Sequence, residues 1–192
     1  MTPEVSAVIL SALPVPAERQ APGCVTLAHV SRFDSASGLL DARLAAIERV
    51  RTPWFFFWDD DDDLPADFAS VLHDCLQAGR QQALVYTDEI IRTPDGERLR
   101  RSAPYSQQAH LQDMMLVHHL ALCRTQAAQE AARSLPRGVY GVEPMLYWQM
   151  AKHGAAYVPR TGYIWNADGG MHLRADVRIG MVQSMHWCGE NP

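Results

Sequence analysis

The sequence predicts a single α/β domain with a mostly parallel sheet flanked by helices. Short apolar runs typical of buried strands alternate with segments of helical periodicity in the first half of the chain, which favours parallel strands joined by covering helices. The 192 residues, 47% of them hydrophobic and 20% charged, suit one soluble globular domain with a substantial core. We expect this domain to span residues 1–168, with residues 169–192 forming a C-terminal tail or lid.

The elements of the first half follow from local patterns. The sequence predicts strands at 5–10, 25–31, 54–58 and 83–92, a helix between Gly38 and Pro53, and a second helix from Pro65 to Gly79. Proline suits the first position of a helix and glycine often closes one. The Pro94-Asp95-Gly96 turn then leads into a further extended segment.

The second half has weaker signals. The sequence predicts a short helix from Ser106 to about Gln112, helices over 125–135 and 141–154, an extended segment over 155–165, and a loop or tail from Asn166 onward. Pro159 cannot donate a ladder hydrogen bond, so the extended segment is expected at the edge of the sheet.

Composition excludes several classes of protein. The net charge of -5 gives no broad attraction to nucleic acid. Four scattered cysteines without a CxxC pair favour reduced thiols over a zinc knuckle or a disulfide framework. The N-terminal residues resemble neither a signal peptide nor a membrane span, which predicts a cytoplasmic protein. The sequence does not indicate an oligomeric state.

The most informative stretch is Trp54–Pro65, WFFFWDDDDDLP. It joins a strand that can be buried on both faces to five carboxylates that must stay solvated or hold a cation. Open α/β sheets bind ligands just beyond the carboxyl ends of their strands. In extended backbone, Asp59 and Asp61 would face one side and Asp60 and Asp62 the other. Such a pair can hold a hard divalent cation that also binds phosphate oxygens, although a solvated loop with helix-capping members also fits.

The chain resembles glycosyltransferase family 2 in several segments. Residues 38–68 contain a Gly-x-x-x-Ala-Arg helix, a strand, and Asp-x-Asp-Asp followed by Leu-Pro and Asp. The resemblance extends over about residues 25–170 through ALVYTDEI at 83–90, ALCR at 121–124, the 141–154 helix and a closing strand at 157–165. It implies a GT-A, Rossmann-like fold that binds a nucleotide-sugar, such as a UDP-sugar, through Mn²⁺ or Mg²⁺.

The family pattern assigns roles by position. The resemblance implies that Asp61 is the main metal ligand, supported by Asp59 and Asp62, and that Asp59, Asp60 and Arg43 bind the nucleotide. A solvated helix position is the alternative for Arg43.

The resemblance also implies a catalytic base at the start of the 141–154 helix. Glu143 is the candidate, with a charge that merely favours the helix terminus as the alternative. His172 is the candidate for a further metal ligand, or else an exposed loop histidine.

Other residues fit the core equally well. His118 and His119 adjoin in an apolar stretch, and neighbouring strand residues point to opposite faces, so at most one should face the site. Trp148 and Trp165 can stack on a sugar or fill the core.

The chain departs from the family pattern upstream. It lacks an Asp-Gly-Ser-x-Asp stretch after the second strand, for which Asp34 is the nearest substitute, so the nucleotide-binding half is abbreviated. The expected function is a metal-dependent, hexosyltransferase-like enzyme that moves a sugar from a nucleotide-diphosphate donor to a hydroxyl acceptor on a glycan, lipid or other molecule, with inversion. The alternatives are a catalytically degenerate GT-A-like domain that acts as a binding or interaction module, and a structural calcium loop.

Overall fold

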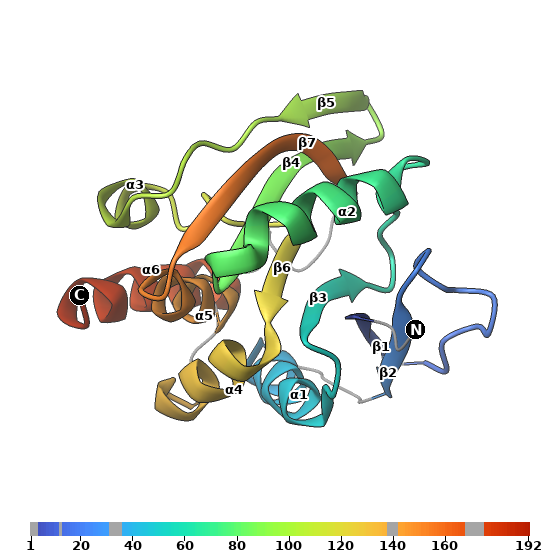
Figure 1. Ribbon diagram of the computed structural model, residues 1–192. Helices are drawn as coiled ribbons and strands as arrows, with labels where there is room; N and C mark the ends of the chain where they lie inside the picture. Colours follow the sequence, from blue (N-terminus) through green and yellow to red (C-terminus); the bar gives the residue numbers. More distant parts are fainter. Residues whose placement is uncertain (1–3, 12, 31–35, 138–141, 168–174) are drawn as a thin grey trace.

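A computed structural model describes residues 4–11, 13–30, 36–137, 142–167 and 175–192 (Figure 1). The strands are β1 (Val5–Ser11), β2 (Val25–Val30), β3 (Trp54–Asp59), β4 (Leu84–Thr93), β5 (Gly96–Arg100), β6 (Ala121–Arg124) and β7 (Ala155–Asn166). The helices are α1 (Ala36–Arg49), α2 (Phe68–Ala78), α3 (Gln107–Gln112), α4 (Thr125–Ser134), α5 (Val142–Ala151) and α6 (Ala175–Glu190), and a 3₁₀ turn, η1 (Gly79–Gln81), follows α2.

The strands form one seven-stranded sheet in the order β2-β1-β3-β6-β4-β5, with β7 on the other side of β4. Strands β1, β2, β3, β4 and β7 run in one direction, and β5 and β6 run against them. The expected α/β class with a mostly parallel sheet is therefore confirmed. Strand β7 pairs along its length only with β4 among the described strands, which confirms the edge position expected from Pro159.

The aromatic strand β3 is buried on both faces. Phe55 and Phe57 belong to a core shared with α1, α4 and α5, whereas Trp54, Phe56 and Trp58 belong to a core shared with α2. Figure 1 shows α2 lying over β4 and β7, with α1, α4, α5 and α6 grouped away from it. Burying one aromatic or large aliphatic side chain contributes about 1.5–3 kcal/mol, so this strand anchors both layers.

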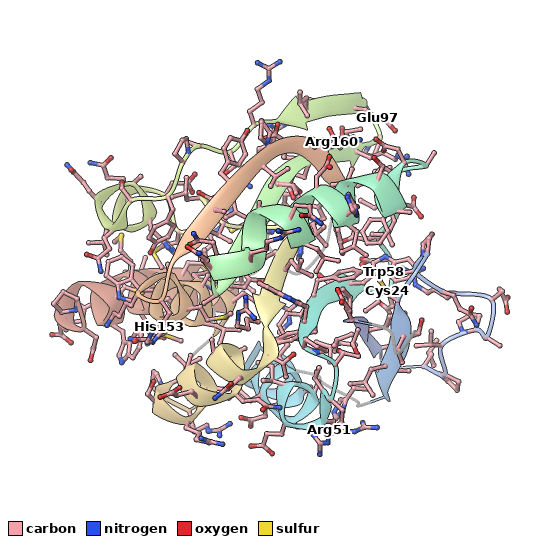
Figure 2. All side chains as sticks on the ribbon, viewed as in Figure 1. Cys24, Arg51, Trp58, Glu97, His153 and Arg160 are labelled. Carbon is pink, nitrogen blue, oxygen red and sulfur yellow. The ribbon has the colours of Figure 1, made fainter. Side chains whose placement is uncertain are left out.

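Helix α2 begins later than expected, because the residues after Pro65 form a turn and Phe68 is its first residue. Asp67 occupies the N-cap position without a side-chain cap hydrogen bond. Its carboxylate instead pairs with Arg160 of β7 at 2.7 Å, and Arg160 also reaches Asp74 of α2 at 2.5 Å. Figure 2 shows Arg160 beside α2, where it ties the helix to the edge strand.

The irregular loop expected from Asn166 onward is wrong for Ala175–Glu190, which form the helix α6. This helix packs against α5 and α3. The indole nitrogen of Trp148 donates to the carbonyl of Asn191 at 2.8 Å, which ties the end of the chain to α5. No helix in the described ranges has the length and apolar character needed to span a bilayer.

Candidate active site

The five aspartates do not continue β3 as an extended segment, so the expected side-to-side alternation is wrong. The strand ends at Asp59, and Asp60 and Asp61 form an exposed turn that closes where the amide of Asp62 donates to the carbonyl of Asp59 at 3.2 Å. The amide of Asn166 donates to Asp62 Oδ1 at 2.7 Å and holds that side chain inward. Asp59 and Asp62 therefore converge, whereas Asp60 and Asp61 lie exposed at the tip.

Asp59, Asp62 and His119 form a cluster in which one ligand atom from each lies within 4.8 Å of the others. His119 Nε2 lies 3.8 Å from Asp59 Oδ2. Asp62 is only 1% exposed, and its buried Oδ2 has no partner at hydrogen-bond geometry among the described residues, although the Tyr163 hydroxyl interacts with this carboxyl. A buried carboxylate oxygen without a partner is costly, and a cation would offset that cost.

The protonation states of the cluster depend on whether a cation is bound. Burial, followed by the neighbouring charge of Asp59, raises the pKa of Asp62 to about 8. Burial, followed by the charge of His118, lowers the pKa of His119 to about 4, so its imidazole is neutral at pH 7 and offers a lone pair. Asp62 therefore holds a proton at pH 7 when no metal is present, and a bound cation would displace that proton. Two carboxylates and a neutral imidazole are then ligands that divalent transition metals accept, so the residues present fit such an ion.

Arg43 of α1 lies beside this cluster and is only 6% exposed, which rules out a solvated helix position. Its Nη2 lies 3.0 Å from Asp59 Oδ1, and its Nη1 forms a close ion pair with Glu143 Oε2 of α5. Burial by itself raises the pKa of Asp59, but the Arg43 guanidinium holds that pKa below its usual value. Glu143 Oε1 is buried and accepts no hydrogen bond from the part of the chain that the structure describes. One arginine thus joins the cluster to Glu143.

Of the two adjacent histidines, only His119 belongs to the cluster with Asp59 and Asp62 in the described part of the chain, whereas His118 pairs with Glu89, which agrees with the expectation that at most one would face the site. The cause is not strand alternation, because residues 113–120 form turns and bends. The two imidazole rings lie 4.0 Å apart between centroids, and His119 stacks on Tyr163 at 4.5 Å. His118 Nδ1 lies 2.7 Å from Glu89 Oε2, and Arg100 Nη1 lies 2.9 Å from Glu89 Oε1. A second buried charge group, Glu89 with His118 and Arg100, therefore supports the cluster from β4.

The remaining candidate residues lie in three places: in the core, beside the site, or outside the described residues. Trp148 is buried in the core, and Trp165 meets His118 edge-on at 5.1 Å between ring centroids. His172 and Asp34 lie outside the described residues.

Sequence reasoning missed two residues that shape the site, Tyr163 and Arg19. Tyr163 accepts a hydrogen bond from the Asp59 amide through its hydroxyl at 2.9 Å, and His119 stacks on the same ring. Arg19, in the loop between β1 and β2, donates to the carbonyls of Asp59 and Asp62. No sequence pattern reveals the partners of these two residues, because each partner lies 40 or more residues away along the chain.

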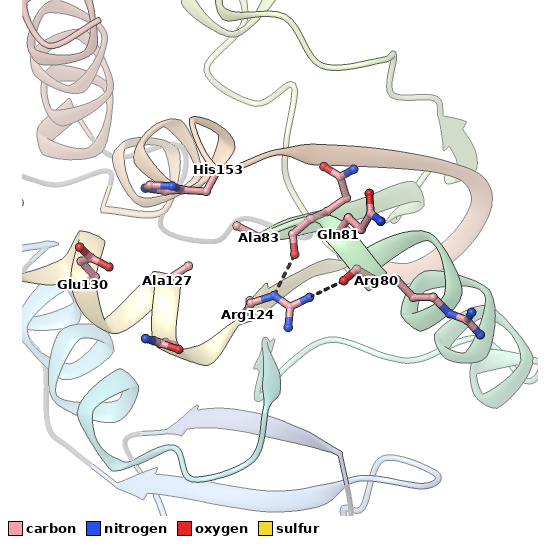
Figure 3. A pocket seen from close by; sticks show the side chains of 9 residues that line it. Arg80, Gln81, Ala83, Arg124, Ala127, Glu130 and His153 are labelled. Atoms are coloured by element: carbon pink, nitrogen blue, oxygen red, sulfur yellow. Dashed lines mark hydrogen bonds between the residues drawn. The ribbon is translucent and has the colours of Figure 1, made fainter.

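A hollow of about 380 Å³ lies at the opposite edge of the sheet, near the starts of β4 and β7 (Figure 3). It is lined by Arg80, Gln81, Gln82, Ala83, Arg124, Gln126, Ala127, Glu130 and His153. Arg124 donates to the carbonyls of Gln82 at 3.0 Å and Gly79 at 2.9 Å. Arg124 therefore braces the backbone there, and the hollow is remote from Asp59 because Arg124 pairs with Trp54 at the other end of β3.

Comparison with known proteins places the fold. No family model and no curated protein sequence matches the chain. The chain is similar to S. aureus TarS residues 1–349 in complex with UDP-GlcNAc, with a TM-score of 0.64 and 9% identity over 94% of this chain and 65% of that one. The UDP complex gives a TM-score of 0.63 and 7% identity over 96% and 65%. The TarS crystal structure of the longer chain gives 0.57 and 8% over 85% and 36%.

The chain thus shares its α/β fold with the S. aureus TarS structures. It spans 65% or less of the length of these TarS chains. At such low identity the likeness concerns the fold, and family 2 membership is not thereby established.

Proposed function

We propose that this chain is a metal-dependent glycosyltransferase that moves a sugar from a nucleotide-diphosphate donor to a hydroxyl acceptor. The observation that carries the proposal is the cluster of half-buried Asp59 with buried Asp62 and His119 at the carboxyl end of β3. Ligands of open α/β sheets bind at that edge. The shared fold of TarS, which binds UDP and UDP-GlcNAc, supports a UDP-sugar as the donor.

The cluster would hold the ion through Asp59, Asp62 and His119. The imidazole of His119 argues against a structural calcium loop, because calcium prefers oxygen ligands. Mg²⁺ shares that preference, so the nitrogen ligand favours Mn²⁺ over Mg²⁺. A divalent cation bound there supplies Lewis-acid stabilisation of the charge that develops on the leaving diphosphate. Asp60 and Asp61 lie exposed at the tip of the turn, where the family pattern would use Asp60 for the nucleotide and Asp61 as a metal ligand.

Arg43 and Glu143 complete the chemistry in this proposal. Glu143 Oε1 would accept the proton of the attacking hydroxyl while the hydroxyl oxygen bonds to the anomeric carbon of the sugar and the bond from that carbon to the diphosphate breaks, releasing the nucleoside diphosphate. This is general-base catalysis with inversion. Arg43 supports this role because it holds the other oxygen of that carboxylate and leaves Oε1 without a partner among the described residues. The family pattern adds His172 as a further ligand and Arg43 as a nucleotide contact.

Titration calorimetry of UDP into the protein, with and without Mn²⁺, tests the binding half of the proposal. Binding that requires Mn²⁺ is expected, and a UDP-sugar incubated with protein and Mn²⁺ should release UDP to an acceptor or to water. Absence of metal-dependent binding to any nucleotide diphosphate would overturn the proposed function.

Glu143→Gln should lower turnover by about 100-fold or more, because a general base contributes about 10²–10⁴-fold to the rate. The KM for the donor should change only a few-fold, since the amide keeps the shape of the side chain. Initial rates of UDP release measure both constants, with UDP titration as the control for an intact site. Unchanged turnover would remove Glu143 from the mechanism.

A binding module without catalysis is the second candidate, and one contact favours it. Arg43 pairs with both Asp59 and Glu143, so two of the acids that catalysis needs are engaged with one guanidinium. Metal-dependent UDP binding without any UDP release from UDP-sugars, across a panel of hydroxyl acceptors, would favour this module.

A further inference from the structure

Arg19 contacts both ends of the acidic turn with one nitrogen. Its Nη2 donates to the carbonyl of Asp59 at 2.8 Å and to the carbonyl of Asp62 at 2.7 Å. The guanidinium carbon lies 4.3 Å from the ring centroid of Trp58, and the Trp58 indole nitrogen donates to the same Asp62 carbonyl at 3.0 Å. Figure 2 labels Trp58 on β3. The turn is thereby tied to a side chain of the α2-facing core.

The turn needs such support because it concentrates negative charge. The carboxylates of Asp59 to Asp61 repel one another, and Asp62 adds a further charge once its proton is lost. Opening of the turn would separate the two ligands at its ends. Hydrogen bonds from a charged donor are about twice as strong as neutral ones. The guanidinium therefore opposes this opening, and the aromatic face beneath it adds cation–π attraction.

The contacts of Arg19 leave the ligand oxygens available. Its hydrogen bonds to the turn go to carbonyls, whereas Arg43 engages the carboxylate of Asp59 itself. An arginine bound to carboxylate oxygens competes with a cation, but one bound to carbonyls organises the turn without occupying the ligands. Preorganisation of this kind lowers the ordering cost of binding.

We propose that Arg19 is a positioning residue that holds Asp59 and Asp62 at their ligating separation before the cation arrives. The inference rests on the proposed function in taking this cluster as the cation site. It follows that loss of Arg19 weakens metal affinity, whereas maximal turnover at saturating metal is retained.

The test compares Arg19→Gln, Arg19→Lys and the wild-type chain by Mn²⁺ titration, followed by electron paramagnetic resonance of the free ion. Residues that orient metal ligands typically contribute about 10–100-fold to affinity, so Arg19→Gln should bind Mn²⁺ about 10-fold or more weakly. The Mn²⁺ affinity of Arg19→Lys should lie between those of Arg19→Gln and the wild type, since an ammonium donates hydrogen bonds but lacks the planar stacking of a guanidinium. Backbone amides of residues 59–63 should exchange faster with deuterium in metal-free Arg19→Gln and return to the wild-type rate at saturating Mn²⁺.

Arg160→Gln is the matched control, because Arg160 is an arginine that joins two segments through Asp67 and Asp74, neither of which belongs to the cluster or to the acidic turn. Its Mn²⁺ affinity should equal that of the wild type. Wild-type affinity and wild-type amide exchange in a folded Arg19→Gln or Arg19→Lys variant would overturn the role of Arg19, while the proposed function stands. A wild-type chain that binds Mn²⁺ in an Arg19-dependent way but transfers no sugar would overturn the proposed function alone. A wild-type chain that binds no Mn²⁺ would overturn both.

Discussion

Asp62→Asn is expected to lower the Mn²⁺-dependent affinity for UDP by at least about 100-fold, since it removes a ligand charge from a buried site. The substitution preserves size and the oxygen that accepts from the Asn166 amide, so local structure should persist.

Without metal, Asp62→Asn should not lower the free energy of unfolding. Burial, followed by Asp59, raises the pKa of Asp62 to about 8 from 3.8, so the folded state binds more protons than the unfolded state between those values. Asp62 therefore lowers the free energy of unfolding of the metal-free wild type as the pH rises from about 4 to 8. The variant lacks this group and should not show that decrease.

The two measurements for Asp62→Asn have opposite signs, which separates loss of a ligand from loss of the fold. Urea unfolding in EDTA at pH 6 and pH 8 gives the stability, and calorimetry with Mn²⁺ and UDP gives the affinity. Asp63→Asn is the matched control, because Asp63 belongs to the same acidic run but is exposed and pairs with Arg92. The metal cluster is contradicted if Asp62→Asn binds UDP with wild-type affinity and metal dependence.

Glu89→Gln is expected to lower the free energy of unfolding by about 3 kcal/mol, the usual cost of removing one partner from a buried ion pair. Glu89 is 1% exposed and lies between Arg100 and His118 at 2.9 and 2.7 Å. The variant leaves Arg100 without its buried partner charge. For a chain of this size the melting temperature should fall by about 10 °C, as measured by calorimetric scans at pH 7.

The same group predicts an acid limit to stability. Burial by itself raises the pKa of Glu89, but the charge of His118 and its hydrogen bond bring that pKa down to about 2, below the ordinary 4.5. Its contribution is therefore complete above pH 4.5 and is lost as pH falls toward 2, and Glu89→Gln should lack this component. Glu97→Gln is the control, since its exposed pair with Arg92 is worth less than about 1 kcal/mol. Equal melting temperatures for Glu89→Gln and Glu97→Gln would contradict a structural role of the buried pair.

Local sequence patterns predicted most of the elements. The aromatic run at 54–58 predicted a strand buried on both faces, and Ser106 predicted the start of α3, where its hydroxyl accepts from the amide of Ala109 at 3.1 Å. Helix α6 was missed because its apolar residues occur on both faces: Val177 and Cys188 are buried, whereas Val182 is exposed. Without one apolar stripe, the segment has no helical signature.

The sequence by itself determined the α/β class, the mostly parallel sheet and the position of the acidic run at the end of β3, because strand and helix periodicities depend on neighbouring residues. Only the tertiary structure decided which acids converge. The turn at Asp60 and Asp61 brings Asp62 beside Asp59, and His119 reaches them from a segment about 60 residues further along the chain. Hydrogen bonds from Arg19 and Asn166, together with burial against Tyr163, select that arrangement, and such long-range contacts are not encoded in residue spacing.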